Sequence, residues 1–362
     1  MSQHQSPLAA EHQADGAFFT DFGGWNLPLR FGSELAEHHT VRQAAGLFDL
    51  SHMAQLDITG QSSPEALDYA LIGQHSAMPL GRASYSMLLT ELGGVIDDLI
   101  VYRLAEDHYF IIANAANREV VVKHLAERLA GFGVGLDDLT LERALIAVQG
   151  PASLEVMRAA GLSGAEALGY YRAALTEVNG AEGMVARTGY TGENGYEVAV
   201  PATKAVPLWR ALAKAGQELG LVKCGLACRD TLRLEAGMPL YGHELDLETT
   251  PVEAGQGWLI RPGKGEYVGG ATLAKAPVRK HLVGLTGQGR RAARAGSMIL
   301  DNEQVVGQVT SGALSPTLGY PIAMAFVHGP APDLGKVYQV DIRGNTAPYT
   351  AVKLPFYTKE KS

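Results

Sequence analysis

Two adjacent carboxylates, Asp97 and Asp98, interrupt an apolar run and are the first residues of this chain that point to chemistry. They follow Gly93-Gly94, which predicts a tight turn because glycine enters positive φ without steric cost. If Val95–Tyr102 is a strand, its side chains alternate between two faces. The pair then either caps and pairs near the turn or acts in a site, since an acid among apolar neighbours needs a partner or a function. The face of Asp98 would hold Ile96, Asp98, Ile100 and Tyr102.

A second group of charges lies in the largely apolar segment 225–237, which we predict to be a helix ended by Gly237. Arg229 and Arg233 are four residues apart on one face of this helix, and Asp230 is adjacent. Two interpretations remain open at this point. The charges form a solvated face, or a partly buried arginine holds an anion.

The cysteines and histidines do not have the spacing of a metal site, and we expect no metal. Cys224 and Cys228 are the only cysteines and are expected one turn apart on a helix, as small buried hydrophobic residues. His38 and His39 would point about 100° apart on a helix, so a shared ion is not expected. The absence of a disulfide framework favours a reducing compartment.

The composition is that of a globular protein. The chain has 362 residues, 46% hydrophobic and 19% charged, which is long enough for two or three domains. The formal net charge of −8 argues against a nucleic-acid or anionic-membrane binder. We see no apolar run long enough to span a membrane and no targeting peptide in the first twenty residues. A cytoplasmic protein is the simplest interpretation.

The predicted elements give an α+β arrangement. Three strand-like runs between 83 and 113 form a meander followed by an amphipathic helix over 117–130, with Val120, Val121, Leu125 and Leu129 inside. Asn194-Gly195 is a hairpin signal before the strand that contains Glu197. Short β-like runs over 281–357, separated by Gly- and Pro-containing turns, predict a small barrel or jelly roll. No internal repeat is apparent.

A series of motifs resembles the aminomethyltransferase, or T-protein, family of the glycine cleavage system. The resemblance runs from about residue 6 to about residue 357, and the order and spacing of the whole series carry it. The motifs are Asp21-Phe22-Gly23-Gly24-Trp25, Gly46–Met53, Gly93–Tyr102, Asn114–Glu119, Arg187–Glu193, Cys228–Gly237 and Thr310-Ser311-Gly312 with its continuation Ser315–Gly319.

The resemblance implies three domains arranged as a cloverleaf around a central folate channel. We expect a discontinuous first domain of 1–53, 140–165 and 198–260, and a second of 54–139 and 166–197. A C-terminal β-barrel or jelly-roll domain would cover 275–362. Both of the first two domains would be mixed α/β with antiparallel sheets.

The resemblance also implies an activity and its partners. Family members use tetrahydrofolate as co-substrate and receive an aminomethyl group from the lipoyl arm of H-protein. The products are 5,10-methylenetetrahydrofolate, ammonia and the dihydrolipoyl carrier. No nucleic acid and no membrane enter this reaction.

Residues that match the family's motifs receive roles by this resemblance. Asp98 matches the aspartate near folate N10, where a carboxylate orients the cofactor and stabilises positive charge. Glu197 matches the glutamate that binds the pterin, and Arg229 matches an arginine close to the cofactor. Further expected cofactor-binding residues are Met53, Tyr85, Tyr102, Asn114, Tyr190 and Tyr357; Arg294 lies with Tyr357 in the part of the last domain that closes the channel.

Two departures and two alternatives accompany this assignment. Ile72-Gly73-Gln74-His75 stands where many members have Thr-Asn-Asp-Val, and Cys228 stands where alanine is common. One alternative is another folate-dependent transferase or demethylase on the same fold. The other is a non-catalytic folate-binding protein of iron–sulfur maturation, whose Lys-Gly-Cys signature is absent here. Arg290, Arg291 and Arg294 either meet an acidic carrier or are only solvated.

Overall fold

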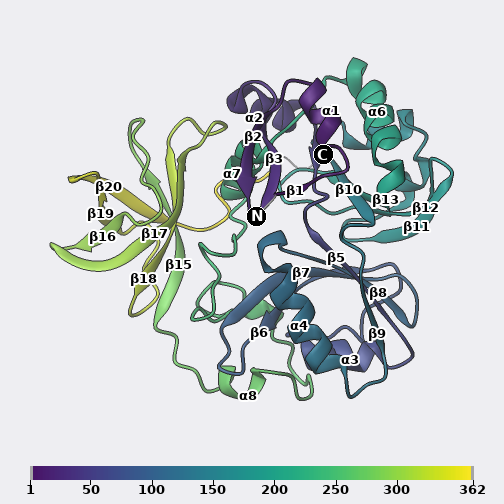
Figure 1. Ribbon diagram of the computed structural model, residues 1–362. Helices are drawn as coiled ribbons and strands as arrows, with labels where there is room; N and C mark the ends of the chain where they lie inside the picture. The colour runs from purple at the N-terminus through teal and green to yellow at the C-terminus, as the bar shows by residue number, and fades with distance from the viewer. Residues whose placement is uncertain (1–2, 360–362) are drawn as a thin grey trace.

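The computed structural model describes residues 3–359 and places three bodies around a common centre (Figure 1). A small N-terminal sheet has the strand order β1-β3-β2. It lies beside two helices, and Ser33 caps the second of them through the amide of Ala36. The elements of this region are β1 (His4–Gln5), α1 (Ala9–Ala14), β2 (Phe18–Phe22), β3 (Trp25–Arg30) and α2 (Glu34–Gln43).

A five-stranded sheet of order β6-β7-β8-β5-β9 forms the body drawn in blue in Figure 1. Its helices pack against one face over the apolar side chains of β5 and β8. The predicted meander and helix are confirmed, except that Val120 is 45% exposed. The elements are β5 (Ala54–Thr59), α3 (Ser63–Ala70), β6 (Ala83–Leu89), β7 (Val95–Arg103), β8 (His108–Ala113), η1 (Ala115–Asn117), α4 (Arg118–Leu129) and β9 (Gly135–Asp138).

A six-stranded sheet of order β11-β12-β13-β10-β4-β14 forms the second body. Strand β11 pairs with β12, and β12 pairs with β13. The segment 166–197, which we expected to belong with 54–139, therefore belongs to this six-stranded sheet and not to the five-stranded one. The elements are β4 (Ala45–Asp49), β10 (Arg143–Gln149), α5 (Ser153–Ala159), η2 (Ser163–Ala167), β11 (Ala173–Val178), β12 (Ala181–Ala186), β13 (Gly195–Pro201), η3 (Ala202–Lys204), α6 (Ala205–Gly216), η4 (Gln217–Leu219) and β14 (Leu221–Lys223).

These two bodies repeat the same order of elements, although the sequence shows no repeat. Each has a strand, a helix, a three-stranded meander, a short 3-10 turn and a second helix. The strand pairings also correspond, with β5·β8 matching β10·β13 and β6·β7 matching β11·β12. We call 54–129 the first repeat and 143–216 the second repeat. The residue types at corresponding positions differ, so the sequence alone did not reveal the repeat.

A long segment then leads to a closed six-stranded barrel of order β15-β18-β17-β16-β19-β20, on the left of Figure 1. The barrel confirms the expected C-terminal domain. The remaining elements are α7 (Leu226–Glu235), η5 (Gly257–Leu259), α8 (Gly270–Leu273), β15 (Lys280–Gly287), β16 (Met298–Asp301), β17 (Gln304–Leu314), β18 (Pro321–His328), β19 (Val337–Ile342) and β20 (Asn345–Val352). The mixed α/β bodies with antiparallel sheets, together with this barrel, confirm the predicted fold class.

One strand departs from simple alternation. A β-bulge shifts the register of β6 against β7, so that Leu88 faces Asp97 while Leu89 faces Val95. Ile96 therefore packs in the cluster of Leu99 and does not share the face of Asp98, contrary to our expectation. Val95 instead packs on the other side of the sheet.

Candidate active site

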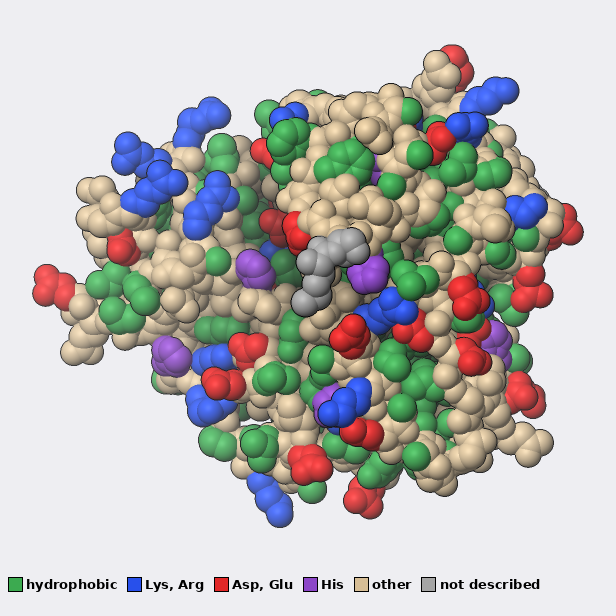
Figure 2. Space-filling model, in the orientation of Figure 1, with side chains coloured by type: hydrophobic (Ala, Val, Ile, Leu, Met, Phe, Trp, Pro, Cys, Tyr) green, Lys and Arg blue, Asp and Glu red, His purple; other side chains and the backbone are tan. Residues whose placement is uncertain are grey.

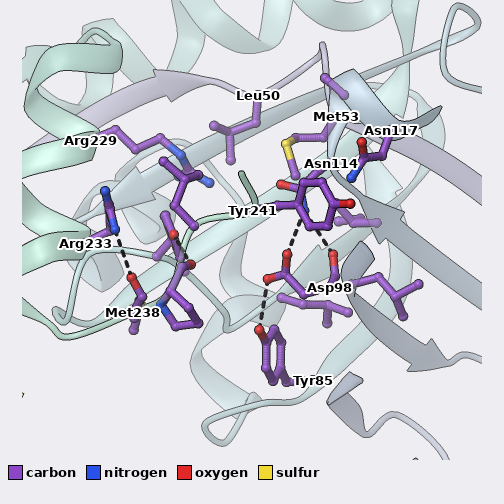
Figure 3. A pocket seen from close by; sticks show the side chains of 18 of the residues that line it. Leu50, Met53, Tyr85, Asp98, Asn114, Asn117, Arg229, Arg233, Met238 and Tyr241 are labelled. Atoms are coloured by element: carbon purple, nitrogen blue, oxygen red, sulfur yellow. Dashed lines mark hydrogen bonds between the residues drawn. The ribbon is translucent and has the colours of Figure 1, made fainter. Parts of the chain in front are cut away.

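A cavity of about 600 Å³ lies where the two repeats, α7 and the segment after α7 meet (Figure 3). The residues that line it lie between Phe22 and Trp258 in the sequence, and most of the exposed wall is apolar. Its size is that of a small-molecule site with a few polar groups for orientation. Seven of the nine residues predicted for the site line this cavity: Met53, Tyr85, Asp98, Asn114, Tyr190, Glu197 and Arg229.

Asp98 projects into the cavity from β7, where two donors hold its carboxylate. The Tyr85 hydroxyl donates to Oδ2 at 2.9 Å, and the Asn114 amide donates to Oδ1 at 2.8 Å (Figure 3). Burial raises the pKa of Asp98, although both hydrogen bonds favour its charged form. The carboxylate is therefore fixed in direction and can hold a proton at a higher pH than an ordinary aspartate.

Asp97 points the other way and is wholly buried. It accepts from the Asn114 backbone at 3.0 Å, the Asn114 amide at 2.8 Å and the Asn117 amide at 2.7 Å. Burial, and then the charge of Asp98, raise its pKa. Its burial and these three hydrogen bonds give Asp97 a structural role beside Asp98. The Asn114 amide bridges the two carboxylates.

Glu197 lies on β13 of the second repeat and is 5% exposed. Its Oε2 accepts from the Thr188 hydroxyl and, at 3.3 Å, from the Tyr102 hydroxyl. Tyr102 is fully buried behind Glu197 and is not among the residues that line the cavity. Tyr102 instead orients the glutamate that does reach the cavity.

Arg229 enters the cavity from α7, on the same side as Arg233 (Figure 3). Its Cζ lies 4.9 Å from the centre of the Tyr190 ring. Among the described residues, its buried Nη1 has no hydrogen-bond partner. Burial lowers the pKa of the guanidinium. Arg233, in contrast, is paired with Glu244 at 3.1 Å and with Asp230 at 2.8 Å. The two arginines left open by the sequence thus differ, because only Arg229 keeps a free buried donor.

Tyr357, predicted to bind the cofactor, is not among the residues that line the cavity. Its ring lies 4.1 Å from the Cζ of Arg42, which also forms ion pairs with Glu193 at 3.0 Å and Glu235 at 2.8 Å. The C-terminal segment is therefore part of the contact between the barrel and α7. Arg294 is exposed and donates to the Gly312 carbonyl at 2.8 Å, also away from the cavity.

The sequence prediction missed several lining residues. Trp258 is 56% exposed and stacks on Tyr85, with ring centres 6.3 Å apart and planes 26° apart. His52 and Tyr171 also line the cavity, and burial lowers the pKa of His52 to about 4. Trp258 stands in the short 3-10 helix η5, where the sequence has no periodicity, so its only signal was an aromatic residue next to glycine.

One group of possible metal ligands was found among the described residues. Carboxylate and thiol atoms of Glu37, Cys224 and Cys228 lie within 4.8 Å of one another. The Glu37 carboxylate already accepts backbone N–H groups of Phe31, Gly32 and Gly225, so it caps two chain segments. We expected Cys224 and Cys228 on one helix, but Cys224 precedes α7 and only Cys228 lies on it.

Comparison with known proteins agrees with this architecture. Residues 8–264 match the family model described as the GCVT N-terminal domain, and 280–358 match the glycine cleavage T-protein C-terminal barrel domain. The chain belongs to the glycine cleavage T-protein family. It is 50% identical to an aminomethyltransferase of Cutibacterium acnes, over 98% of each chain. It is also 50% identical to one of Saccharopolyspora erythraea, over 99% of each.

A solved structure supports the same assignment to the T-protein family. The glycine cleavage system aminomethyltransferase T of Bartonella henselae superposes with a TM-score of 0.92 at 36% identity, covering 98% of both chains. The expected enzyme class, an aminomethyltransferase of the glycine cleavage system, is thereby confirmed. Within residues 3–359, no helix is both long and apolar enough to cross a membrane.

Proposed function

We propose that the cavity binds tetrahydrofolate and that Asp98 acts in the transfer of a one-carbon unit to it. The donor would be the aminomethyl group on the lipoyl arm of H-protein. The products would be 5,10-methylenetetrahydrofolate, ammonia and dihydrolipoyl H-protein. The observation that carries this proposal is the enclosed, donor-held carboxylate of Asp98 in a cavity that also holds Glu197 and the free donor of Arg229.

The residues present fit a folate. Tyr85, Tyr190 and Trp258 provide flat faces for a conjugated ring, and Met53 provides a polarizable contact. Glu197 provides a carboxylate for the N–H donors of a pterin. The unpaired Nη1 of Arg229 would find an acceptor in a carboxylate of the glutamyl part.

Bound tetrahydrofolate supplies the amine that accepts the one-carbon unit. Asp98 would orient this amine and stabilise the positive charge that develops beside it. Its raised pKa also lets it hold a proton released at the reacting nitrogen. Tyr85 and Asn114 keep the carboxylate in one direction, which lowers the reorganisation needed during the reaction.

A direct assay tests this function. The purified chain is mixed with aminomethylated lipoyl H-protein and tetrahydrofolate, and ammonia and methylenetetrahydrofolate are measured. We expect both products in equal amounts. Folate binding with no ammonia would contradict the proposal, and transfer of a methyl group from a small amine or sulfonium would favour a demethylase on the same fold.

A further inference from the structure

Four arginines stand side by side at the junction of the two repeats. Strand β6 of the first repeat meets β11 of the second through a bridge between Arg82 and Arg172. Arg103 lies opposite Arg82, because its N–H donates to the Arg82 carbonyl at 3.0 Å. Arg187 lies opposite Arg172 through the equivalent bond at 2.8 Å. We call Arg103, Arg82, Arg172 and Arg187 the arginine row.

The row has approximate two-fold symmetry. The N–H of Gly81 donates to the Arg103 carbonyl at 2.8 Å, and the N–H of Tyr171 donates to the Arg187 carbonyl at 3.0 Å. Both donors have a left-handed backbone, with φ of +70° at Gly81 and +58° at Tyr171. Each forms a bulge of the type that places a left-handed residue first. The bridge lies between these two bulges, so the arginines occupy neighbouring strands over roughly 15 Å.

All four side chains project from the same side. Their sequence neighbours Ala83, Tyr102, Ala173 and Ala186 belong to one buried cluster between the sheets. Because side chains alternate along a strand, the arginines point away from that cluster. The cluster also contains Tyr171 and Met53, which line the folate cavity, so the row faces away from the proposed active site.

The guanidinium groups are held in place and have no acidic partner. Arg82 and Arg172 each use Nη1 on a carbonyl of the other repeat, at Tyr170 and Leu80 respectively. None of the four forms an ion pair within residues 3–359. The buried Nε atoms of Arg103 and Arg187 have no hydrogen-bond partner in that range.

Such an arrangement is unfavourable without a ligand, because like charges on facing strands destabilise a sheet. The chain as a whole carries −8, so this row is a local exception. Leu80 and Tyr170, whose carbonyls hold the row, expose 52% and 59% of their surfaces. Arginine with tyrosine is enriched in protein interfaces, and guanidinium pairs with carboxylates in a two-bond geometry.

We propose that the arginine row is a docking surface for an acidic segment of another protein. Carboxylates of the partner would pair with the Nη groups of Arg82 and Arg172, and apolar side chains would cover Leu80 and Tyr170. Because backbone carbonyls already hold the guanidinium groups, little side-chain entropy is lost on binding. This surface is separate from the folate cavity and does not depend on the function proposed for it.

The test uses a fluorescent deca-glutamate peptide and the full chain at low salt. We expect R82Q/R172Q to lower peptide affinity at least tenfold, and the matched variant R290Q/R291Q, which removes the same charge from exposed barrel residues, to change it less than twofold. Activity and thermal melting serve as folding checks. Arg172→Lys is the second variant, and it should still weaken binding because it keeps charge but loses the two-bond geometry.

Three results would overturn the proposal. One is the absence of peptide binding to the native chain, and another is equal loss in R82Q/R172Q and R290Q/R291Q. The third is tighter binding of a single-stranded RNA of equal charge at the same salt, since this would assign the row to nucleic acid. A rise in melting temperature with the peptide, present in the native chain and absent in R82Q/R172Q, would support it.

Discussion

The two repeats share a backbone plan but carry their acids in different environments. Positions in the two repeats correspond when they lie equally far along the chain from the arginine row. Asp98 on β7 and Glu182 on β12 each precede an arginine of the row by five residues, and Met87 and Glu177 each follow one by five residues. Asp98 is enclosed in the cavity, whereas Glu182 and Glu177 are exposed. The face of Met87 is covered by residues from far along the chain, including Leu245, Ala254 and Leu259. A distant segment, rather than the strand itself, turns an acid into a candidate catalytic group.

The second carboxylate of the cavity, Glu197, belongs to the second repeat and has no acidic counterpart in the first. Glu197 on β13 faces Ala186, and the corresponding pair in the first repeat is Phe110 with Tyr102. The first repeat has an apolar ring where the second has an acid. Each repeat therefore contributes one carboxylate, from positions that do not correspond, to a cavity between them.

The largest expected effect separates the two corresponding acids. Asp98→Asn should lower turnover roughly 100-fold or more, because it removes a charged group at the reacting centre. Glu182→Gln, its counterpart in the second repeat, should leave turnover unchanged. Ammonia release measures both, and circular dichroism checks folding. Similar turnover in the two variants would break the distinction between the repeats.

The next effect concerns folate affinity. Glu197→Ala should weaken tetrahydrofolate binding by about 1–3 kcal/mol, because pterin donors would lose their acceptor. Glu177→Ala, an exposed acid of the same repeat, is the matched control. Titration calorimetry measures the affinity of each. Unchanged affinity in Glu197→Ala would remove this glutamate from the site.

A smaller effect should appear in the pH dependence of stability. Because burial raises the pKa of Asp98, the folded protein binds its proton more tightly than the unfolded chain. The stabilisation that this bound proton gives to the folded state is complete below about pH 4, and it is lost as the pH rises through the pKa of Asp98 in the folded protein. Asparagine does not titrate. The unfolding free energy of Asp98→Asn relative to the native chain should therefore increase with pH, as urea melts from pH 4 to 9 would measure. Parallel curves would contradict an enclosed acid.

The smallest effect tests the junction of the repeats. Gly81→Ala should cost about 1–2 kcal/mol of unfolding free energy, because its φ is +70° and a Cβ would lie 3.0 Å from the Ala173 carbonyl. Gly289→Ala has a similar φ of +75° but meets nothing within 4 Å, so it should cost less. Thermal melts compare the two. An equal cost would mean that close approach of the repeats adds no constraint.

Local pattern was sufficient for much of this protein. The turn at Gly93-Gly94, the meander, the amphipathic helix and the barrel strands follow from periodicity and turn residues, and the structure confirms them. The motif series placed Asp98, Glu197 and Arg229 in one site, and they line one cavity. These features depend on residues that are neighbours in the sequence or on sequence motifs shared with the family.

Tertiary structure alone decided the rest. The opening pair illustrates this, because a bulge that no local pattern signals moved Ile96 away from Asp98. Tyr102 and Tyr357 match family motifs, yet one orients Glu197 and the other packs on Arg42. The repeat and its arginine row arise from pairing between strands about 90 residues apart, which periodicity cannot detect. Burial of an acid depends on what covers it, and here the cover comes from a different part of the chain.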